Sequence, residues 1–177
     1  ATPVCAFAVK HLNAKGAVMF TASHNPPEYQ GLKFIPFYAG PATPDITSVI
    51  ESYIPDAPAK IKVAEGDART FDPTENYIAH VKSLVQISGN GQVVVTDTLH
   101  GVGGRYLPRI LRECGFEVVS INEELRPDFA GLSPEPKRET LGNLASEARK
   151  LKTLGLSTDG DADRFGIVDE NGDFYSA

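Results

Sequence analysis

The chain has 177 residues, of which 41% are hydrophobic and 23% are charged. These proportions are typical of a globular protein with a real core, and the length suits one large domain or one and a half ordinary ones. The net charge of −6 argues against nucleic acid and anionic membrane surfaces as partners, because both attract basic proteins. The two cysteines belong to no C-x-x-C pair, and no apolar run approaches a membrane span, so we expect a reducing, cytoplasmic location.

The first 54 residues carry signals of both helices and strands. Thr2-Pro3 predicts a helix start with Thr2 as the N-cap, and short apolar runs predict strands at 16–20 and 31–37. A weak helix is expected at 45–53. The chain begins without Met and inside an apparent helix, so we expect it to be part of a longer protein.

A polar segment at 55–70, rich in proline, glycine and charged residues, predicts a linker. After it, helix and strand signals alternate. Helices are expected after Pro73, after the glycine-rich turn at 100–104 and between Glu139 and Gly155; strands are expected at 92–96, 116–121 and 154–158, and a hairpin at 165–176. This alternation predicts an α/β fold of layered mixed, largely parallel sheets with flanking helices. Residues 71–177 would form one near-complete domain, truncated at its C-terminal end, and residues 1–54 the remnant of a similar one.

Three aspartates alternate in the sequence DGDADR that follows the strand expected at 154–158. Asp159, Asp161 and Asp163 would share one face of an extended backbone, where their charges repel unless a cation lies between them. A hard divalent cation such as Mg²⁺ prefers oxygen ligands of this kind. Arg164 beside them could bind a phosphate or fix a carboxylate.

Two other interpretations of this acidic loop stay open. It could be a solvated acidic turn without a ligand. It could also be an EF-hand calcium loop, with Glu170 at its twelfth position. That interpretation is weakened by Arg164, which stands where the EF-hand turn requires glycine, and by flanks that resemble strands.

A second candidate segment, TASHNPPEYQGLKF, runs from residue 21 to 34. Ser23 could belong to a simple turn capped by serine and asparagine side chains. A hydrolase pair of Ser23 and His24 is disfavoured, because adjacent side chains in an extended loop point apart and no G-x-S-x-G motif is present. A third possibility is a serine that carries a phosphoryl group. Lys33 could then exchange a proton with the reacting oxygen if its neighbours lowered its pKa.

Together, these segments resemble the α-D-phosphohexomutases, the phosphoglucomutase/phosphomannomutase family. TASHNPPEYQGLKF is similar to the family's phosphoserine loop, and DGDADR is similar to its magnesium loop. The stretches VVVTDTLHGVGGRYLPRIL and SPEPKRETLGNL also resemble the family's second domain. The resemblance therefore covers nearly the whole chain, from the end of domain 1 through most of domain 2.

The resemblance implies a role for each matching residue. Ser23 would carry the catalytic phosphoryl group, with His24 and Asn25 as neighbours in the same loop, and Lys33 would be the general acid/base. Asp159, Asp161 and Asp163 would bind Mg²⁺ together with a phosphoryl oxygen on Ser23, and Arg164 would be an active-site cation. Gly101, Gly103 and Gly104 match no phosphate-binding motif and are interpreted as turn residues.

The implied enzyme is an isomerase of carbohydrate metabolism that interconverts hexose 1-phosphate and hexose 6-phosphate. A hexose 1,6-bisphosphate would be its intermediate and activator. Glucose, mannose and glucosamine phosphates fit the resemblance equally. Complete family members have further domains with a sugar-binding and a phosphate-binding loop, and neither pattern occurs here, so we expect this chain alone to be inactive. The alternatives are a non-catalytic calcium-binding module and a metal-dependent phosphatase.

Overall fold

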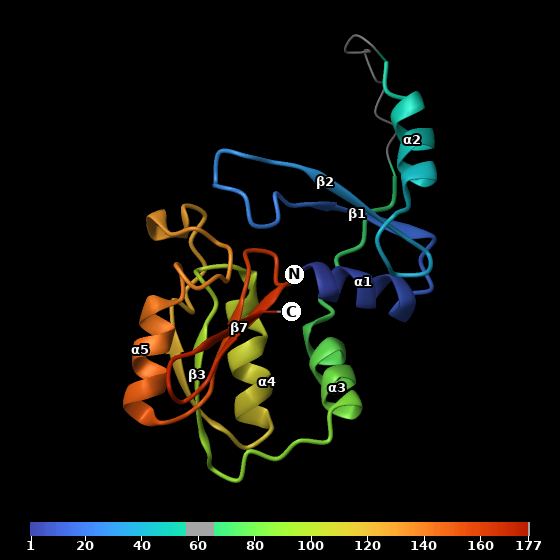
Figure 1. Ribbon diagram of the computed structural model, residues 1–177. Helices are drawn as coiled ribbons and strands as arrows, with labels where there is room; N and C mark the ends of the chain where they lie inside the picture. The colour runs from blue at the N-terminus through green and yellow to red at the C-terminus, as the bar shows by residue number, and fades with distance from the viewer. Residues whose placement is uncertain (56–65, 177) are drawn as a thin grey trace.

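The computed structural model describes residues 1–55 and 66–176, so most of the linker expected at 55–70 lies outside the described residues. A small N-terminal sheet pairs β1 (Gly16–Phe20) antiparallel with β2 (Leu32–Pro36). Helix α1 (Thr2–His11) packs against both strands, as Figure 1 shows. Helix α2 (Pro44–Ser52) buries none of its residues.

The larger sheet has five strands in the order β4-β3-β5-β6-β7. Their bounds are β3 (Val93–Asp97), β4 (Glu117–Ile121), β5 (Gly155–Thr158), β6 (Phe165–Val168) and β7 (Phe174–Ser176). Strand β3 runs parallel to β4 and β5, whereas β6 and β7 form the expected antiparallel hairpin. Its turn contains Gly172 with a φ of 81°, a conformation that glycine adopts readily.

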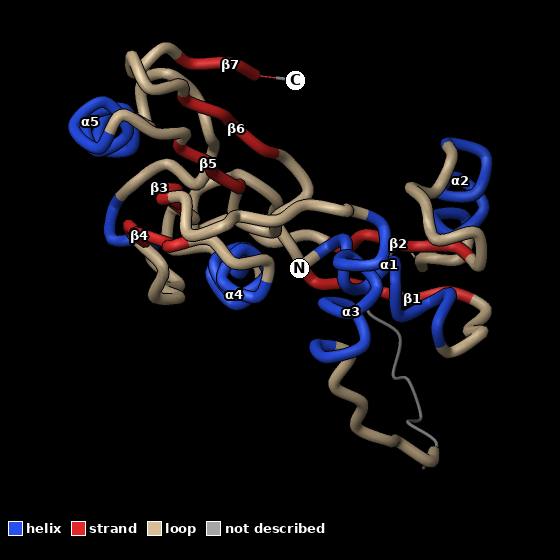
Figure 2. Tube along the Cα trace, turned by 90° about the horizontal axis from the view of Figure 1, so that it is seen from below, coloured by secondary structure: helices blue, strands red, loops and turns tan. Residues whose placement is uncertain are grey.

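Three helices accompany this sheet: α3 (Thr74–Leu84), α4 (Leu107–Glu113) and α5 (Gly142–Leu151). Figure 2 shows α5 on one face of the sheet and α4 on the other, while α3 lies between α4 and α1. The predicted α/β fold with mixed sheets and flanking helices is confirmed, with parallel pairing confined to β4, β3 and β5.

The core lies between the sheet and α5. It is built from six buried side chains: Val95, Leu99, Leu141, Leu144, Ala148 and Val168. A Cβ atom at Gly155 would come within 2.8 Å of Leu144, so glycine lets the helix approach β5 closely. Within the described residues, no helix is long and apolar enough to cross a membrane.

Two predicted helix ends are wrong. Thr2 does not cap α1: Ala1 is the N-cap residue, and the Thr2 hydroxyl donates a hydrogen bond to Asp161 instead. Helix α5 does not reach Gly155, because Lys152 adopts a left-handed conformation and ends it three residues earlier. At Thr2, a hydrogen bond to a distant residue takes the place of the expected cap. At Lys152, the left-handed backbone ends the helix before the glycine is reached.

The parallel strands decide where a functional site can lie. The carboxyl ends of β3 and β5 meet at the same edge of the sheet, with Asp97 opposite Ser157. Ligand sites in such folds lie at this edge. The acidic loop begins here, directly after Thr158.

The burial of Leu144 predicts that its side chain contributes strongly to the free energy of unfolding. Leu144 is fully buried, so Leu144→Ala should lower the free energy of unfolding by about 2–5 kcal/mol in urea titrations. Leu151→Ala on the same helix is the control, since Leu151 is 38% exposed and should cost less than about 1 kcal/mol. Equal losses for the two variants would contradict this assignment of the core.

Candidate active site

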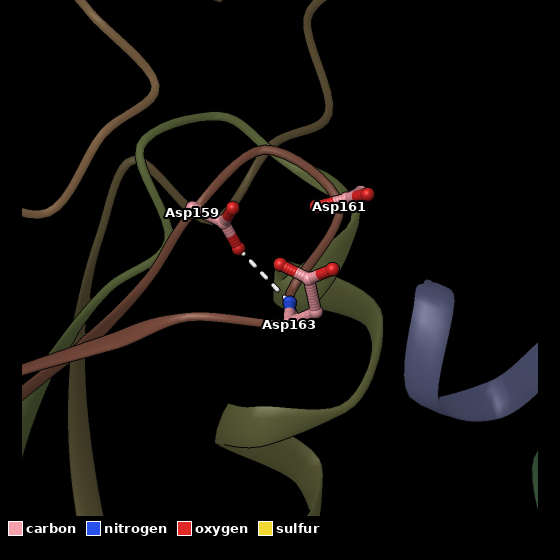
Figure 3. A group of neighbouring side chains, drawn as sticks. All are labelled: Asp159, Asp161 and Asp163. Atoms are coloured by element: carbon pink, nitrogen blue, oxygen red, sulfur yellow. Dashed lines mark hydrogen bonds between the residues drawn. The ribbon is translucent and has the colours of Figure 1, made fainter. Parts of the chain in front are cut away.

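The three aspartates meet in the loop between β5 and β6. One carboxylate oxygen from each of Asp159, Asp161 and Asp163 lies within 4.8 Å of the other two (Figure 3). Asp159 and Asp161 are 0% and 4% exposed, whereas Asp163 is accessible. The predicted cluster is therefore present, but it forms in a turn in which Ala162 has a φ of 62°, not on an extended backbone, and two of its three carboxyl groups are buried.

The loop backbone fixes Asp159. Its Oδ1 atom accepts hydrogen bonds from the backbone N–H groups of Asp163 and Arg164, at 2.9 and 3.0 Å. The first of these bonds is drawn in Figure 3. Asp159 Oδ2 is buried and has no hydrogen-bond partner among the described residues. One oxygen thus shapes the loop and the other remains free.

The two carboxylate oxygens of Asp161 also differ in their hydrogen bonding. Its Oδ2 accepts from the Thr2 hydroxyl at 2.7 Å, the Thr21 hydroxyl at 3.0 Å and the Lys33 ammonium at 2.8 Å. Its Oδ1 is buried and accepts no hydrogen bond from residues 1–55 or 66–176. An unpartnered buried carboxylate oxygen is costly, and a divalent cation with oxygen ligands is the partner that suits it. The residues present therefore fit a Mg²⁺-type ion.

Burial and hydrogen bonding separate the two buried carboxyl groups. Burial, aided by the neighbouring carboxylates and opposed by the Arg164 N–H, raises the pKa of Asp159 from 3.8 to about 7. Burial would also raise the pKa of Asp161, but the hydrogen bonds from Lys33, Thr2 and Thr21 outweigh it and lower that pKa. The loop thus holds one firmly ionised carboxylate beside one that resists ionisation.

The glycine-rich turn after β3 packs directly against the acidic loop. Val102 N–H donates to the Gly160 carbonyl at 3.0 Å. A Cβ atom at Gly101 would lie 2.8 Å from Gly160, and one at Gly103 would collide with the Thr158 hydroxyl. These glycines therefore permit close backbone contact with the acidic loop, which is a structural role.

Ser23 lies in a strained turn after β1. Its φ of 58° is in the left-handed region, which costs a non-glycine residue roughly 1–2 kcal/mol. The Ser23 N–H donates to the Thr21 hydroxyl at 2.9 Å. A Cβ atom at Gly160 would lie 2.7 Å from the Ser23 carbonyl oxygen. The serine loop and the acidic loop are therefore in direct contact.

The neighbours of Ser23 have different surroundings. His24 Nδ1 lies 3.4 Å from Ser23 Oγ. The expectation that these adjacent side chains point apart is wrong, because Ser23 is left-handed and the loop is not extended there. Among the described residues, His24 forms no hydrogen bond to a carboxylate that would complete a hydrolase triad. Asn25 donates its side-chain amide to the Ala22 carbonyl at 2.9 Å and so stabilises the turn.

Lys33 extends from β2 to the aspartates. Its ammonium group lies 2.8 Å from Asp161 Oδ2 and 2.7 Å from Asp163 Oδ2. Burial favours the neutral amine, but the hydrogen bonds and charges of these two carboxylates outweigh it and raise the pKa of Lys33. In this arrangement Lys33 is held in its protonated, charged form. A general base would need a lowered pKa instead.

Arg164 lines a cavity beside the acidic loop. The cavity has a volume of about 630 Å³, and its walls include Lys33, Asp163, Arg164 and residues of α1 and β2. The Arg164 side chain is 49% exposed, and its nearest carboxylate is Glu135 at 3.8 Å. It is thus available to a phosphate group.

The calcium-loop alternative does not fit this geometry. Strands β5 and β6 flank the acidic loop, where an EF-hand has helices. Glu170 is exposed and belongs to the turn between β6 and β7, so it is separated from the aspartates by the length of β6.

Sequence reasoning missed three contributors to the site, namely Thr2, Thr21 and Gly160. The sequence predicts Thr2 as a helix cap and indicates no role for Thr21. No pattern in the sequence shows that both hydroxyls bond a carboxylate 159 and 140 residues away.

Comparison with known proteins supports this architecture. The family model "Phosphoglucomutase/phosphomannomutase, alpha/beta/alpha domain II" matches residues 75–172, and the corresponding domain I model matches residues 1–60. A relative from Pyrococcus abyssi named "Probable phosphoglucosamine mutase" is 37% identical over 178 residues. A "Phosphoglucomutase/phosphomannomutase" of Thermococcus kodakarensis is 37% identical over 179 residues. Each match covers 98% of this chain and 39% of the relative.

A solved structure agrees with these matches. The crystal structure of a Thermus thermophilus protein, described as a phosphomannomutase, superposes with a TM-score of 0.88 at 36% identity. It covers 98% of this chain and 41% of the other. The chain thus spans about two fifths of the length of the relatives it matches. The domain II model alone matches more than half of its residues, and the chain therefore belongs to the phosphoglucomutase/phosphomannomutase family.

Proposed function

We propose that this chain supplies the phosphoryl-carrying serine and the divalent-metal site of a phosphohexomutase. One observation carries the proposal: the Ser23 loop and the buried aspartate loop are bonded to each other through Thr21 and Asp161. Phosphoryl transfer depends on positioning and charge neutralisation more than on covalent chemistry, and this junction offers both.

In this proposal, Ser23 Oγ carries a phosphoryl group and gives it to a hydroxyl of a hexose monophosphate. The P–O bond to Ser23 breaks, and a new P–O bond forms to the sugar. The Lys33 ammonium donates a proton to the departing Ser23 oxygen and takes up the proton that the attacking sugar hydroxyl loses, so its charge is restored within the transfer, and its raised pKa keeps it protonated between transfers. The hexose 1,6-bisphosphate formed in between turns around, and the same proton exchange runs in reverse when the second phosphoryl group returns to Ser23. Arg164, which lines the cavity, binds phosphate oxygens.

Asp159, Asp161 and Asp163 would hold Mg²⁺ in this scheme. When bound, the ion supplies electrostatic stabilisation of the transferring phosphoryl oxygens. The support is a pair of buried oxygens, one on Asp159 and one on Asp161, that have no hydrogen-bond partner within the described residues. His24 and Asn25 shape the serine loop, and His24 can also contact the phosphoryl group.

The proposed division assigns residues 1–54 to the end of domain 1, 55–70 to a linker and 71–177 to domain 2. The rest of the polypeptide would provide the groups that bind the sugar hydroxyls and the distal phosphate, since the chain spans 39% of its curated relatives. The names of these relatives include glucosamine, glucose and mannose phosphates, and we propose a phosphohexose without choosing among them. A phosphatase is the alternative, and it would release inorganic phosphate.

The first prediction concerns Ser23. The complete polypeptide should gain one phosphoryl group on Ser23 after exposure to glucose 1,6-bisphosphate and Mg²⁺, because Ser23 contacts the metal loop. Mass spectrometry of peptides locates the group. Ser23→Ala should abolish both the labelling and the mutase activity, while Ser88→Ala, on an exposed loop, should change neither. Undiminished labelling or activity in Ser23→Ala would refute the assignment.

The second prediction follows from the raised pKa of Asp159. In the unfolded chain this carboxyl ionises near 3.8, whereas in the folded chain it does so near 7. Between these values the unfolded state binds fewer protons, so ionisation lowers the stability of the metal-free protein as pH rises. Asp159→Asn should therefore stabilise the metal-free chain at pH 8 by about 1–3 kcal/mol in urea titrations.

The gain should shrink as pH falls from 7 towards 4, and Mg²⁺ should stabilise the unaltered chain but not Asp159→Asn. Asp163→Asn is the control, because Asp163 is accessible and paired with Lys33 and should bring no such gain. A gain that does not depend on pH would show that the charge of Asp159 is not its cause.

A further inference from the structure

Thr21 makes three hydrogen bonds at the junction of the two loops. Its backbone N–H donates to the Gly31 carbonyl at 3.0 Å, which closes the serine loop at its base. Its hydroxyl oxygen accepts from the Ser23 N–H at 2.9 Å and donates to Asp161 Oδ2 at 3.0 Å. A hydroxyl has one proton to donate and lone pairs to accept with, so both side-chain bonds form at once.

The bond to Ser23 acts on a strained backbone. Ser23 holds a φ of 58°, which a serine does not favour without compensation. The Thr21 hydroxyl and the Asn25 side chain both bond groups within this turn. Removing the hydroxyl would leave the Ser23 N–H without its partner and weaken the restraint on the turn.

The bond to Asp161 acts on a carboxylate whose two oxygens differ. Donors from Thr2, Thr21 and Lys33 all bond Oδ2, whereas Oδ1 is buried with no hydrogen-bond partner in the part of the chain that the structure describes. Saturating one oxygen fixes the rotation of the carboxylate and presents the other to a cation. Threonine is suited to this because its β-branch restricts χ1 and so fixes the direction of the hydroxyl.

We propose that Thr21 is a positioning residue that couples the phosphoryl-carrying serine to the metal ligand Asp161. The inference rests on the proposed function of the same site. Through one hydroxyl, Thr21 holds the Ser23 backbone in its left-handed conformation and orients the free oxygen of Asp161. It touches no reacting atom, and its effect passes through these two residues.

The test compares three variants of the 177-residue chain by calorimetric titration with Mn²⁺, a probe that prefers the same oxygen ligands. Thr21→Val keeps the shape and removes the hydroxyl, and it should weaken Mn²⁺ binding about 10- to 100-fold, as expected for loss of a group that orients a ligand. Thr21→Ser keeps the hydroxyl and should remain within a few-fold of the unaltered chain. Thr2→Val is the matched control, because it removes a donor to the same oxygen without contacting Ser23.

A second measurement, made without metal, asks whether Thr21 also restrains Ser23 or only orients the Asp161 carboxylate. Hydrogen exchange of the Ser23 amide, followed by NMR, should accelerate in Thr21→Val and stay unchanged in Thr2→Val. Both threonine-to-valine variants should weaken Mn²⁺ binding, and only one should loosen Ser23. Thr21→Ala replaces Thr21→Val if valine prevents folding.

Unchanged Mn²⁺ affinity in Thr21→Val, or equal Ser23 exchange in the two valine variants, would overturn the inference. If the unaltered chain binds no Mn²⁺, the proposed metal site itself fails. The coupling is then also refuted, and the Ser23 exchange shows whether Thr21 merely holds the loop.

Discussion

The hydrogen bonds to Asp161 Oδ2 are the interaction on which the site depends. They join a loop of the five-stranded sheet to α1, to the serine loop and to β2 through Thr2, Thr21 and Lys33. Hydrogen bonds to an ionised group are roughly twice as strong as neutral ones, and three of them outweigh the cost of burying this carboxylate. The same bonds bring Ser23 against the aspartates. Lys33 adds a second polar connection between the two segments, to Asp163 Oδ2 at 2.7 Å.

Several features of the site are destabilising and must be compensated by the packing of the surrounding fold. Asp159 is fully buried, with one oxygen that no described residue bonds, and Ser23 is strained. Nearby, Leu99 and His100 are both left-handed, in a turn that the buried Asp97 carboxylate holds by accepting from Leu99 N–H at 2.9 Å. Such features persist only where the surrounding packing compensates for them. Here the buried core between β3, β5 and α5 lies directly beneath the turn and the acidic loop.

Much of this arrangement was predictable from local sequence. Short apolar runs and turn residues give the order of helices and strands, and alternating aspartates after a strand indicate a cation site. The residues alone left Ser23 between a turn and a phosphoryl carrier, and the family resemblance favoured the carrier role, with Lys33 as its acid/base. Local patterns failed where a distant group decides the outcome, as at Thr2, whose hydroxyl bonds Asp161 and not its own helix. The direction of the Lys33 pKa is likewise set by distant groups, since two aspartates of the loop between β5 and β6 raise it.

The contact between the serine loop and the acidic loop is the central claim, and ³¹P NMR of the Ser23-phosphorylated chain tests it directly. Paramagnetic broadening by Mn²⁺ falls steeply with distance from the ion. If Mn²⁺ binds at Asp159, Asp161 and Asp163, the phosphoserine resonance should broaden strongly when one equivalent is added, and Mg²⁺ should reverse the effect by competition. A phosphoserine signal that stays sharp while Mn²⁺ occupies the aspartates would contradict the account.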